Sequence, residues 1–249
     1  MGDRRKVGSI ATLRVNRSLI LQRGVVTYYK FLAREIANQF KLLGMEGVIS
    51  AINNAETMLT NLLITENGLT ADAIGNKQLA LIEARIKKQF GFDFASQMQF
   101  FLAARALKTV SLVSGTDRAA AAGIISVGFA NGLTNIEISN QLQAQFTSIA
   151  TAYRAARIAR TETFIAASEA QDVSAKESGV DLVKEWVAID DDRTRNNHKS
   201  PSVDGQIREL DGTFQVGRDT MKGPHDVSAS AGNIVNCRCV LNYIPKSIL

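Results

Sequence analysis

All of the cysteine and histidine in this chain of 249 residues lies in its C-terminal quarter. Cys237 and Cys239 occur in the short sequence NCRC, and the two histidines are His198 and His225. Thiolate and imidazole are ligands that zinc prefers, so the four side chains could form a Cys₂His₂ zinc site. The spacing is unusual, because structural zinc sites commonly pair C-x₂₋₄-C with H-x₃₋₅-H. The favoured interpretation is therefore that both thiols pack as small apolar side chains in a core.

A second set of side chains able to do chemistry lies in the segment DDDRTRNNH, residues 190–198. Its carboxylates, guanidinium groups and imidazole could act as the acid, base and anion-binding groups of a hydrolytic enzyme. The chain, however, has no H-E-x-x-H, G-x-S-x-G or P-loop motif beside this segment. We favour an Asx-rich turn, in which aspartates accept hydrogen bonds from backbone N–H groups and arginines clamp the aspartates to the preceding helix. The residues concerned are Asp190, Asp191, Asp192, Arg193, Arg195 and His198.

The elements that position these groups change character near residue 180. Before that point the chain has no proline, and apolar residues recur at spacings of three and four, which predicts helices. The predicted helices span about 11–43, 46–64, 71–90, 95–114, 117–130 and 149–178, with a capping box at Thr134 and Glu137. Beyond it, alternating apolar and polar residues predict short strands near 182–189, 206–210 and 233–244. The last of these would place Cys237 and Cys239 on one face.

The sequence therefore predicts an α+β protein. A predominantly α-helical region with a basic N-terminal arm would occupy residues 1–124, and a small mixed module with a few short strands would occupy residues 125–249. The chain has no apolar stretch long enough to span a membrane and no apolar signal segment near residue 1. We expect it to be made and folded in a reducing cytoplasm, where a pair of cysteines is more often reduced than bridged.

Positive charge is concentrated near the N-terminus. Residues 1–41 carry nine basic side chains (Arg4, Arg5, Lys6, Arg14, Arg17, Arg23, Lys30, Arg34 and Lys41) and two acidic ones (Asp3 and Glu35). Four of the basic residues recur at spacings of 7, 4 and 7, which aligns them along one side of the first helix. We call this set the basic ridge: Arg23, Lys30, Arg34 and Lys41. The favoured interpretation is a solvated helix face, and the alternative is a surface that contacts the phosphates of double-stranded DNA.

The order of several motifs in the second half resembles a known family. GLTNIEISNQL is followed by RAARIARTETFIAA, by a Trp-containing strand leading into DDDRTRNNH, and then by DGQ, Phe214, a Pro-x-Asp turn and NCRC. Residues of about 125–243 thereby resemble the head-morphogenesis domain of tailed-phage minor capsid proteins, the MuF-like family. The resemblance implies that one set of residues defines the fold: Arg160, Thr161, Glu162, Trp186, Asp190, Arg193, Arg195, His198, Gly205, Asn236, Cys237 and Cys239.

The chain departs from the family pattern at two places. The segment SPSV lengthens the connection between His198 and DGQ, and His225 stands where relatives often have glycine. His225 is therefore expected to be a local substitution, and only His198, Cys237 and Cys239 remain as candidate zinc ligands. We expect no cofactor, with zinc at these three residues as the less favoured alternative.

The resemblance also implies a function. It implies a non-enzymatic minor head protein that associates with the portal vertex during capsid assembly and stays in the capsid interior of the virion in multiple copies. Its partners would be the portal protein and the major capsid or scaffold protein, with DNA at the basic ridge, and it would occupy the host cytoplasm during assembly. The alternative is a phage-delivered effector or hydrolytic enzyme that uses the C-terminal Asp, His and Cys cluster, since relatives of this module occur joined to toxin or effector domains.

Overall fold

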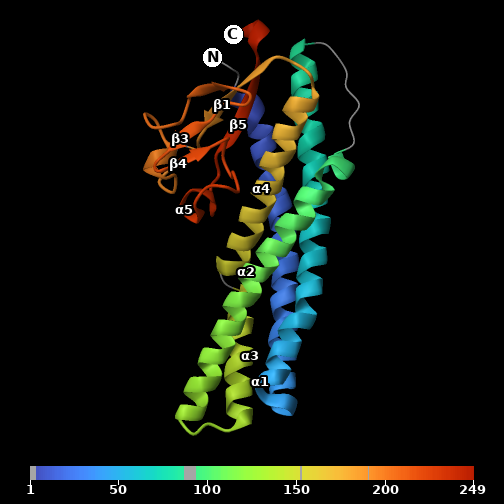
Figure 1. Cartoon of the computed structure of the whole chain (residues 1–249), viewed down its shortest axis with the longest axis vertical. Helices are drawn as coiled ribbons and strands as arrows, with labels where there is room; N and C mark the ends of the chain where they lie inside the picture. Colours follow the sequence, from blue (N-terminus) through green and yellow to red (C-terminus); the bar gives the residue numbers. More distant parts are fainter. Residues whose placement is uncertain (1–3, 87–93, 152, 190) are drawn as a thin grey trace. The chain divides into compact units, whose positions relative to one another are not determined.

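The structure is a computed structural model that describes residues 4–86, 94–151, 153–189 and 191–249 (Figure 1). The chain forms two compact units, each assembled from separate stretches of sequence. One unit comprises Met1–Ser18, Asn67–Gln99 and Arg160–Leu249, and the other comprises Leu19–Glu66 and Phe100–Ala159. The predicted domain boundary between residues 124 and 125 lies inside α2. It therefore stays a prediction, which marks where the family motifs begin in the sequence. The α+β class is confirmed.

The first two helices are longer than the sequence predicts, and the helix predicted over 149–178 is shorter. The long helices are α1 (Arg4–Ile86), α2 (Phe94–Ala130), α3 (Asn135–Thr151) and α4 (Tyr153–Glu177). The break predicted after residue 43 is confirmed, because Gly44 adopts a left-handed φ of 61° inside α1. The breaks predicted near residues 65–70 and 115–116 are wrong, since the helix continues through both. A lone glycine inside a helix costs only about 1 kcal/mol relative to alanine, which side-chain packing readily offsets.

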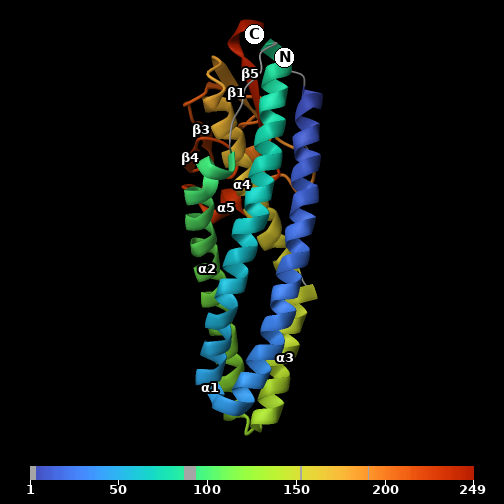
Figure 2. The same cartoon turned by 90° about the vertical axis from the view of Figure 1, so that its right-hand side faces the viewer.

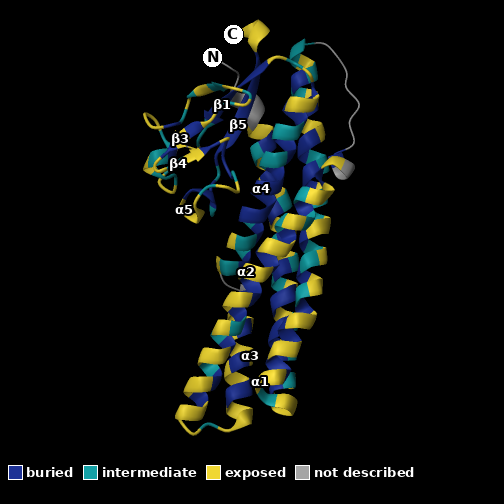
Figure 3. Cartoon of the chain, in the orientation of Figure 1, coloured by how far each residue is buried: buried dark blue, intermediate teal, exposed yellow. Residues whose placement is uncertain are grey.

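The unit built from 19–66 and 100–159 is a bundle of helices. Gly44 turns α1 back on itself, and its two arms run side by side (Figures 1 and 2). The close approach is visible at Gly47, where an added Cβ would fall 2.2 Å from the backbone oxygen of Gln39. The buried residues of the first arm follow the predicted apolar stripe, shown as the dark face in Figure 3: Leu21, Val25, Tyr28, Leu32, Ile36 and Phe40. Leu43, predicted to continue the stripe, is exposed beside the turn.

The connection from α2 to α3 confirms the predicted capping box. The Glu137 backbone N–H donates to Thr134 Oγ1 at 3.3 Å, and the Thr134 backbone N–H donates to Glu137 Oε2 at 2.8 Å. These reciprocal bonds satisfy N–H groups that have no partner inside the helix. Gly132, with φ of 69°, provides the left-handed residue that reverses the chain just before them.

The other unit contains a small sheet module that follows α4, which ends before Gly179 (φ 60°) as the sequence predicts. A three-stranded antiparallel sheet has the order β2-β1-β5, and β3 pairs with β4 as a separate hairpin. The elements are β1 (Leu182–Val187), the short helix η1 (Asn196–His198), β2 (Ile207–Glu209), β3 (Phe214–Val216), β4 (Asp219–Met221), α5 (Ala231–Ile234), β5 (Val240–Pro245) and η2 (Lys246–Ile248). Trp186 of β1 stands opposite Leu241 of β5.

One strand prediction is wrong in its first half. The strand predicted over 233–244 begins only at Val240, and the residues before it form α5 and an irregular segment that holds both cysteines. Asn236 adopts a left-handed φ of 58°, which an extended strand cannot contain. The cysteines therefore do not lie on a strand face. They lie in the core of the module with Trp186, Phe214 and Tyr243.

Candidate functional site

Three of the predicted site residues meet in the core of the sheet module. The Nδ1 atom of His198 lies 3.6 Å from Cys237 Sγ and 3.6 Å from Cys239 Sγ, and the three ligand atoms all lie within 4.8 Å of one another. The side chains are buried, with exposed fractions of 1%, 3% and 2%. His198 comes from η1, and the two cysteines come from the segment between α5 and β5. Cys237 and Cys239 lie 39 and 41 positions after His198 in the sequence. We call this set the His-Cys-Cys cluster: His198, Cys237 and Cys239.

Hydrogen bonds around Asn233 fix the tautomer of His198. The Nδ2 group of Asn233 donates to the Val216 carbonyl at 3.0 Å and to Asp219 Oδ2 at 2.8 Å, so its Oδ1 is the atom facing His198 Nε2 at 3.2 Å. Because Oδ1 can only accept, Nε2 carries the proton and Nδ1 presents a lone pair to the two sulfurs. Sequence reasoning missed Asn233, since an asparagine near a turn gives no signal of this role.

The second histidine lies beside the cluster and not in it. His225 is buried, and its Nε2 lies 2.7 Å from Arg14 Nη2. A guanidinium can only donate, so Nε2 accepts and the proton of the neutral ring sits on Nδ1. Nδ1 has no nitrogen or oxygen partner, and the Cys237 thiol is its neighbour. Burial lowers the pKa of His225, which keeps the ring neutral. Among the described residues, the hydrogen-bond partner of the His225 ring is therefore Arg14 and not a sulfur.

A buried arginine completes the surroundings. Arg14, on α1, has no exposed surface. It donates to the Cys239 backbone carbonyl at 3.1 Å and to His225, and its guanidinium carbon lies 4.1 Å from the ring centre of Phe164. Burial lowers its pKa to about 10. Sequence reasoning placed Arg14 only in the basic arm, although its spacing of four from Ile10 and Ser18, both buried, puts it on the buried side of the helix.

A hydrogen bond between the two thiols shifts their pKa values in opposite directions. It lowers the pKa of the Cys237 thiol well below its usual value, against the opposing effect of burial. The same hydrogen bond raises the pKa of Cys239. The surroundings therefore favour negative charge on sulfur at Cys237.

Several predicted fold-defining residues hold the NCRC segment in place. Arg160 Nη1 donates to Asn236 Oδ1 at 3.4 Å, and the Asn236 backbone N–H donates to Thr161 Oγ1 at 3.3 Å. Arg195 donates to the Val235 carbonyl. Glu162, the neighbour of Thr161 on α4, is buried as well. These contacts tie NCRC to α4.

Two further predicted residues stabilise the sheet edge. The Gly205 backbone N–H donates to the Trp186 carbonyl at 2.8 Å, and Gly205 adopts φ of 79°. The Trp186 ring centre lies 5.5 Å from that of His198 and 5.4 Å from that of Phe214. Trp186 thus packs directly on the His-Cys-Cys cluster.

The aspartate-rich segment does not form a converging acid and base set. Asp191 forms a two-pronged ion pair with Arg238, which holds the pKa of that carboxyl well below its usual range. The Arg193 backbone N–H donates to Asp191 Oδ1 at 3.0 Å, the geometry of an Asx turn. Asp192 and the Arg193 side chain are exposed, and Asp190 lies outside the described residues. The Asx turn is as predicted, whereas the arginine that holds Asp191 is Arg238 of the NCRC segment and does not clamp the turn to the preceding helix.

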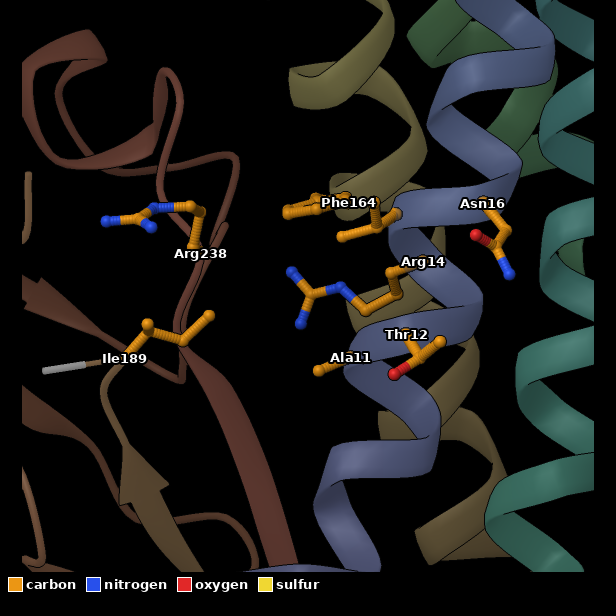
Figure 4. Close-up of a pocket in the computed structure, with 8 residues that line it drawn as sticks. Ala11, Thr12, Arg14, Asn16, Phe164, Ile189 and Arg238 are labelled. Carbon is orange, nitrogen blue, oxygen red and sulfur yellow. The ribbon is translucent and has the colours of Figure 1, made fainter. Parts of the chain in front are cut away.

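A pocket of about 270 Å³ lies on the outer side of Arg14 (Figure 4). Its walls are largely apolar, apart from Thr12, Asn16 and the two guanidinium groups that Figure 4 shows on Arg14 and Arg238. Both guanidinium groups already have partners, the first in the buried core and the second in Asp191. The pocket therefore presents little unsatisfied polar chemistry.

The basic ridge lies on the first arm of α1, in the helical bundle. Arg23, Lys30, Arg34 and Lys41 are all exposed. Arg34 lies 3.4 Å from Glu35 Oε1, so one of the four cations has an acidic neighbour. Among the described residues, no helix is long and apolar enough to cross a membrane.

The second half of the chain is similar in sequence to known proteins. Residues 124–242 match the family described as phage Mu protein F like protein. The chain is also 33% identical over 122 residues to the NAD(+)–arginine ADP-ribosyltransferase EFV of Enterococcus faecalis strain ATCC 700802 / V583. That similarity covers 46% of this chain and 23% of the relative, so the chain spans less than a quarter of the length of the relative. No solved structure matches the chain.

Proposed function

We propose that this chain, whose residues 124–242 match the family described as phage Mu protein F like protein, is a structural minor capsid protein that associates with the portal vertex during assembly. It is retained inside the capsid of the mature virion in several copies. The family match is the observation that carries this proposal. The geometry of the module supports it, since the described motif residues hold backbone segments together and do not converge on an open site.

The portal partner can be tested by co-expression. The chain is produced with a tagged portal protein from the phage that encodes it, and in parallel with the tagged major capsid protein as a matched bait. We expect the chain to co-purify with the portal at a fixed molar ratio and to be less enriched on the major capsid protein. Equal recovery on both baits, or recovery on neither, would contradict portal association.

The exposed basic ridge supports contact with packaged DNA. Four phosphate contacts would give a slope of about −3.6 in log affinity against log salt concentration, without preference for base sequence. The test replaces the four ridge cations by glutamine and measures binding to a duplex at several salt concentrations. A control variant removes the same charge from four scattered exposed cations: Lys77, Lys108, Arg157 and Arg218.

The two variants show whether DNA binding depends on the alignment of the ridge cations or on the net charge of the chain. We expect the ridge variant to lose most of the binding and most of the salt slope, and the scattered variant to retain them. Equal losses would mean that net charge alone attracts DNA. Unchanged binding in the ridge variant would refute a role of the ridge.

The similarity to an ADP-ribosyltransferase supports a second candidate, an effector carried into the host. The matched part of that relative is short, both thiols of this module are buried, and Asp191 is held in an ion pair with Arg238. We therefore rank it below the structural role. The purified chain is incubated with labelled NAD⁺ and an arginine-containing acceptor protein. We expect no transfer of label, and transfer that rises with the concentration of the chain would establish the enzymatic alternative.

A further inference from the structure

The geometry of the His-Cys-Cys cluster matches the spacing of ligands around a tetrahedral metal ion. With zinc–nitrogen bonds of about 2.0 Å and zinc–sulfur bonds of about 2.3 Å, tetrahedral angles place nitrogen and sulfur ligands about 3.5 Å apart. His198 Nδ1 lies 3.6 Å from each of the two sulfurs. Both nitrogen–sulfur distances therefore fit tetrahedral zinc, and the two sulfurs lie within 4.8 Å of each other, where a zinc tetrahedron would place them about 3.8 Å apart. We propose that His198 Nδ1, Cys237 Sγ and Cys239 Sγ bind a zinc ion.

The hydrogen bonds behind His198 are those of a metal ligand. A ligating histidine normally donates its second ring N–H to an oxygen, which fixes the tautomer and the orientation of the ring. Here Nε2 donates to Asn233 Oδ1, and Asn233 is held in turn by Asp219 and by the Val216 carbonyl. The lone pair on Nδ1 consequently points between the two sulfurs.

Zinc binds cysteine as thiolate, and a buried cation lies close to the two sulfurs. Arg14 donates to the Cys239 carbonyl at 3.1 Å, which places positive charge beside the segment that carries both thiols. Zinc with two thiolates is electrically neutral, so binding displaces the thiol protons and leaves no net charge on the three ligands and the ion. The competing interpretation, two thiols packed as apolar groups, leaves unexplained why the buried His198 directs Nδ1 at both sulfurs.

The three protein ligands leave one position for a fourth. His225 does not supply it in this arrangement, because coordination through Nδ1 would need the proton on Nε2, where Arg14 also donates. A water or hydroxide is the remaining candidate. Soft thiolate ligands together with imidazole favour zinc over magnesium or calcium. Because all three ligands are buried, the ion has a structural role: it joins η1 to the NCRC segment and closes the chain between them.

The test uses the full chain without a histidine tag, purified without chelator. We expect about one zinc per chain by elemental analysis, and cobalt in its place should give the visible and sulfur-to-cobalt charge-transfer absorption of a tetrahedral thiolate site. Single variants His198→Ala, Cys237→Ser and Cys239→Ser should each lose the metal. The matched control is His225→Gly, which removes a neighbouring histidine at a position whose φ of 68° glycine adopts readily, and it should retain the metal.

A second measurement uses the wild-type chain, so that the proposal can be tested even if the variants fail to fold. Trp186 is the only tryptophan and packs on His198, so its fluorescence reports on this core. Strong chelator should change the fluorescence of the wild-type chain and lower its melting temperature, and added zinc, but not magnesium, should restore both. A folded wild-type chain that contains no zinc and takes up no cobalt would overturn the proposal. So would metal content that survives in Cys237→Ser and Cys239→Ser. This test is independent of the proposed function, because a head protein and an effector would give the same result.

Discussion

Replacing Arg14 by methionine tests whether the buried guanidinium holds the core of the sheet module together. The substitution keeps an unbranched side chain of similar length and removes the charge and the hydrogen-bond donors. It leaves two buried acceptors, the Cys239 carbonyl and His225 Nε2, without the partners that now lie at 3.1 and 2.7 Å. Each orphaned buried acceptor costs about 1–3 kcal/mol. Loss of the guanidinium above Phe164 adds about 1–2 kcal/mol.

The net loss of stability is smaller than this sum, because a buried methionine carries no cation that must be desolvated on folding. We therefore expect the free energy of unfolding to fall by about 2–5 kcal/mol. Urea unfolding followed by Trp186 fluorescence at a fixed free zinc concentration measures it, since this tryptophan is fully buried in the same core. The control is Arg23→Met, an exposed arginine on the same helix, which should change stability by less than about 0.5 kcal/mol. A loss below about 1 kcal/mol for Arg14→Met would refute the reasoning.

Three further predictions concern the helices. Burial raises the pKa of Asp117 from 3.8 to about 6, so the folded chain binds more protons than the unfolded chain in that range, and the free energy of unfolding should fall by about 2 kcal/mol as pH rises from 4 to 6. Asp117→Asn should remove this slope, and an unchanged slope in urea titrations at several pH values would contradict it. Thr134→Ala removes the capping box with Glu137 and should cost about 1 kcal/mol, measured by chemical unfolding, whereas a neutral result would show that the box does not stabilise α3. Gly75→Ala would put a Cβ 2.6 Å from ring carbons of Phe94, so its melting temperature should fall, and an unchanged value would mean that this packing can relax.

Local signals in the sequence identified much of the fold. The absence of proline before Pro201 and the apolar spacing predicted a helical region, and Thr134 with Glu137 marked the start of α3. Gly44 and Gly179 marked the two helix ends at which the backbone adopts positive φ. These features depend on a few neighbouring residues, so a sequence pattern can reveal them.

Features that depend on distant residues were not predictable in the same way. The helix continues through Asn67 and Ser114 because both are buried by tertiary packing, which local propensity does not record. The hairpin of β3 and β4 was missed, since each strand has only three residues. The NCRC segment was predicted as a strand because its side chains alternate as they do in a strand. The prediction fails because Asn236 adopts a left-handed φ, which bends the backbone.

The candidate site shows the same limit. The sequence identified His198, Cys237 and Cys239 as a trio, but their spacing matched no zinc motif, and buried thiols were the favoured interpretation. The spacing is uninformative because a hairpin and several turns lie between the ligands, so their proximity is set by the fold. Arg14 and Asn233, which decide the protonation and orientation of the neighbouring groups, become recognisable only from their contacts.

The most direct test of the central claim is to quantify this chain in purified particles of the phage that encodes it. Mass spectrometry with labelled peptide standards would compare DNA-filled virions, empty procapsids and the soluble lysate. The structural role predicts a fixed number of copies per portal in procapsids and in virions. Its absence from both kinds of particle, with the protein present only in the lysate, would contradict the account.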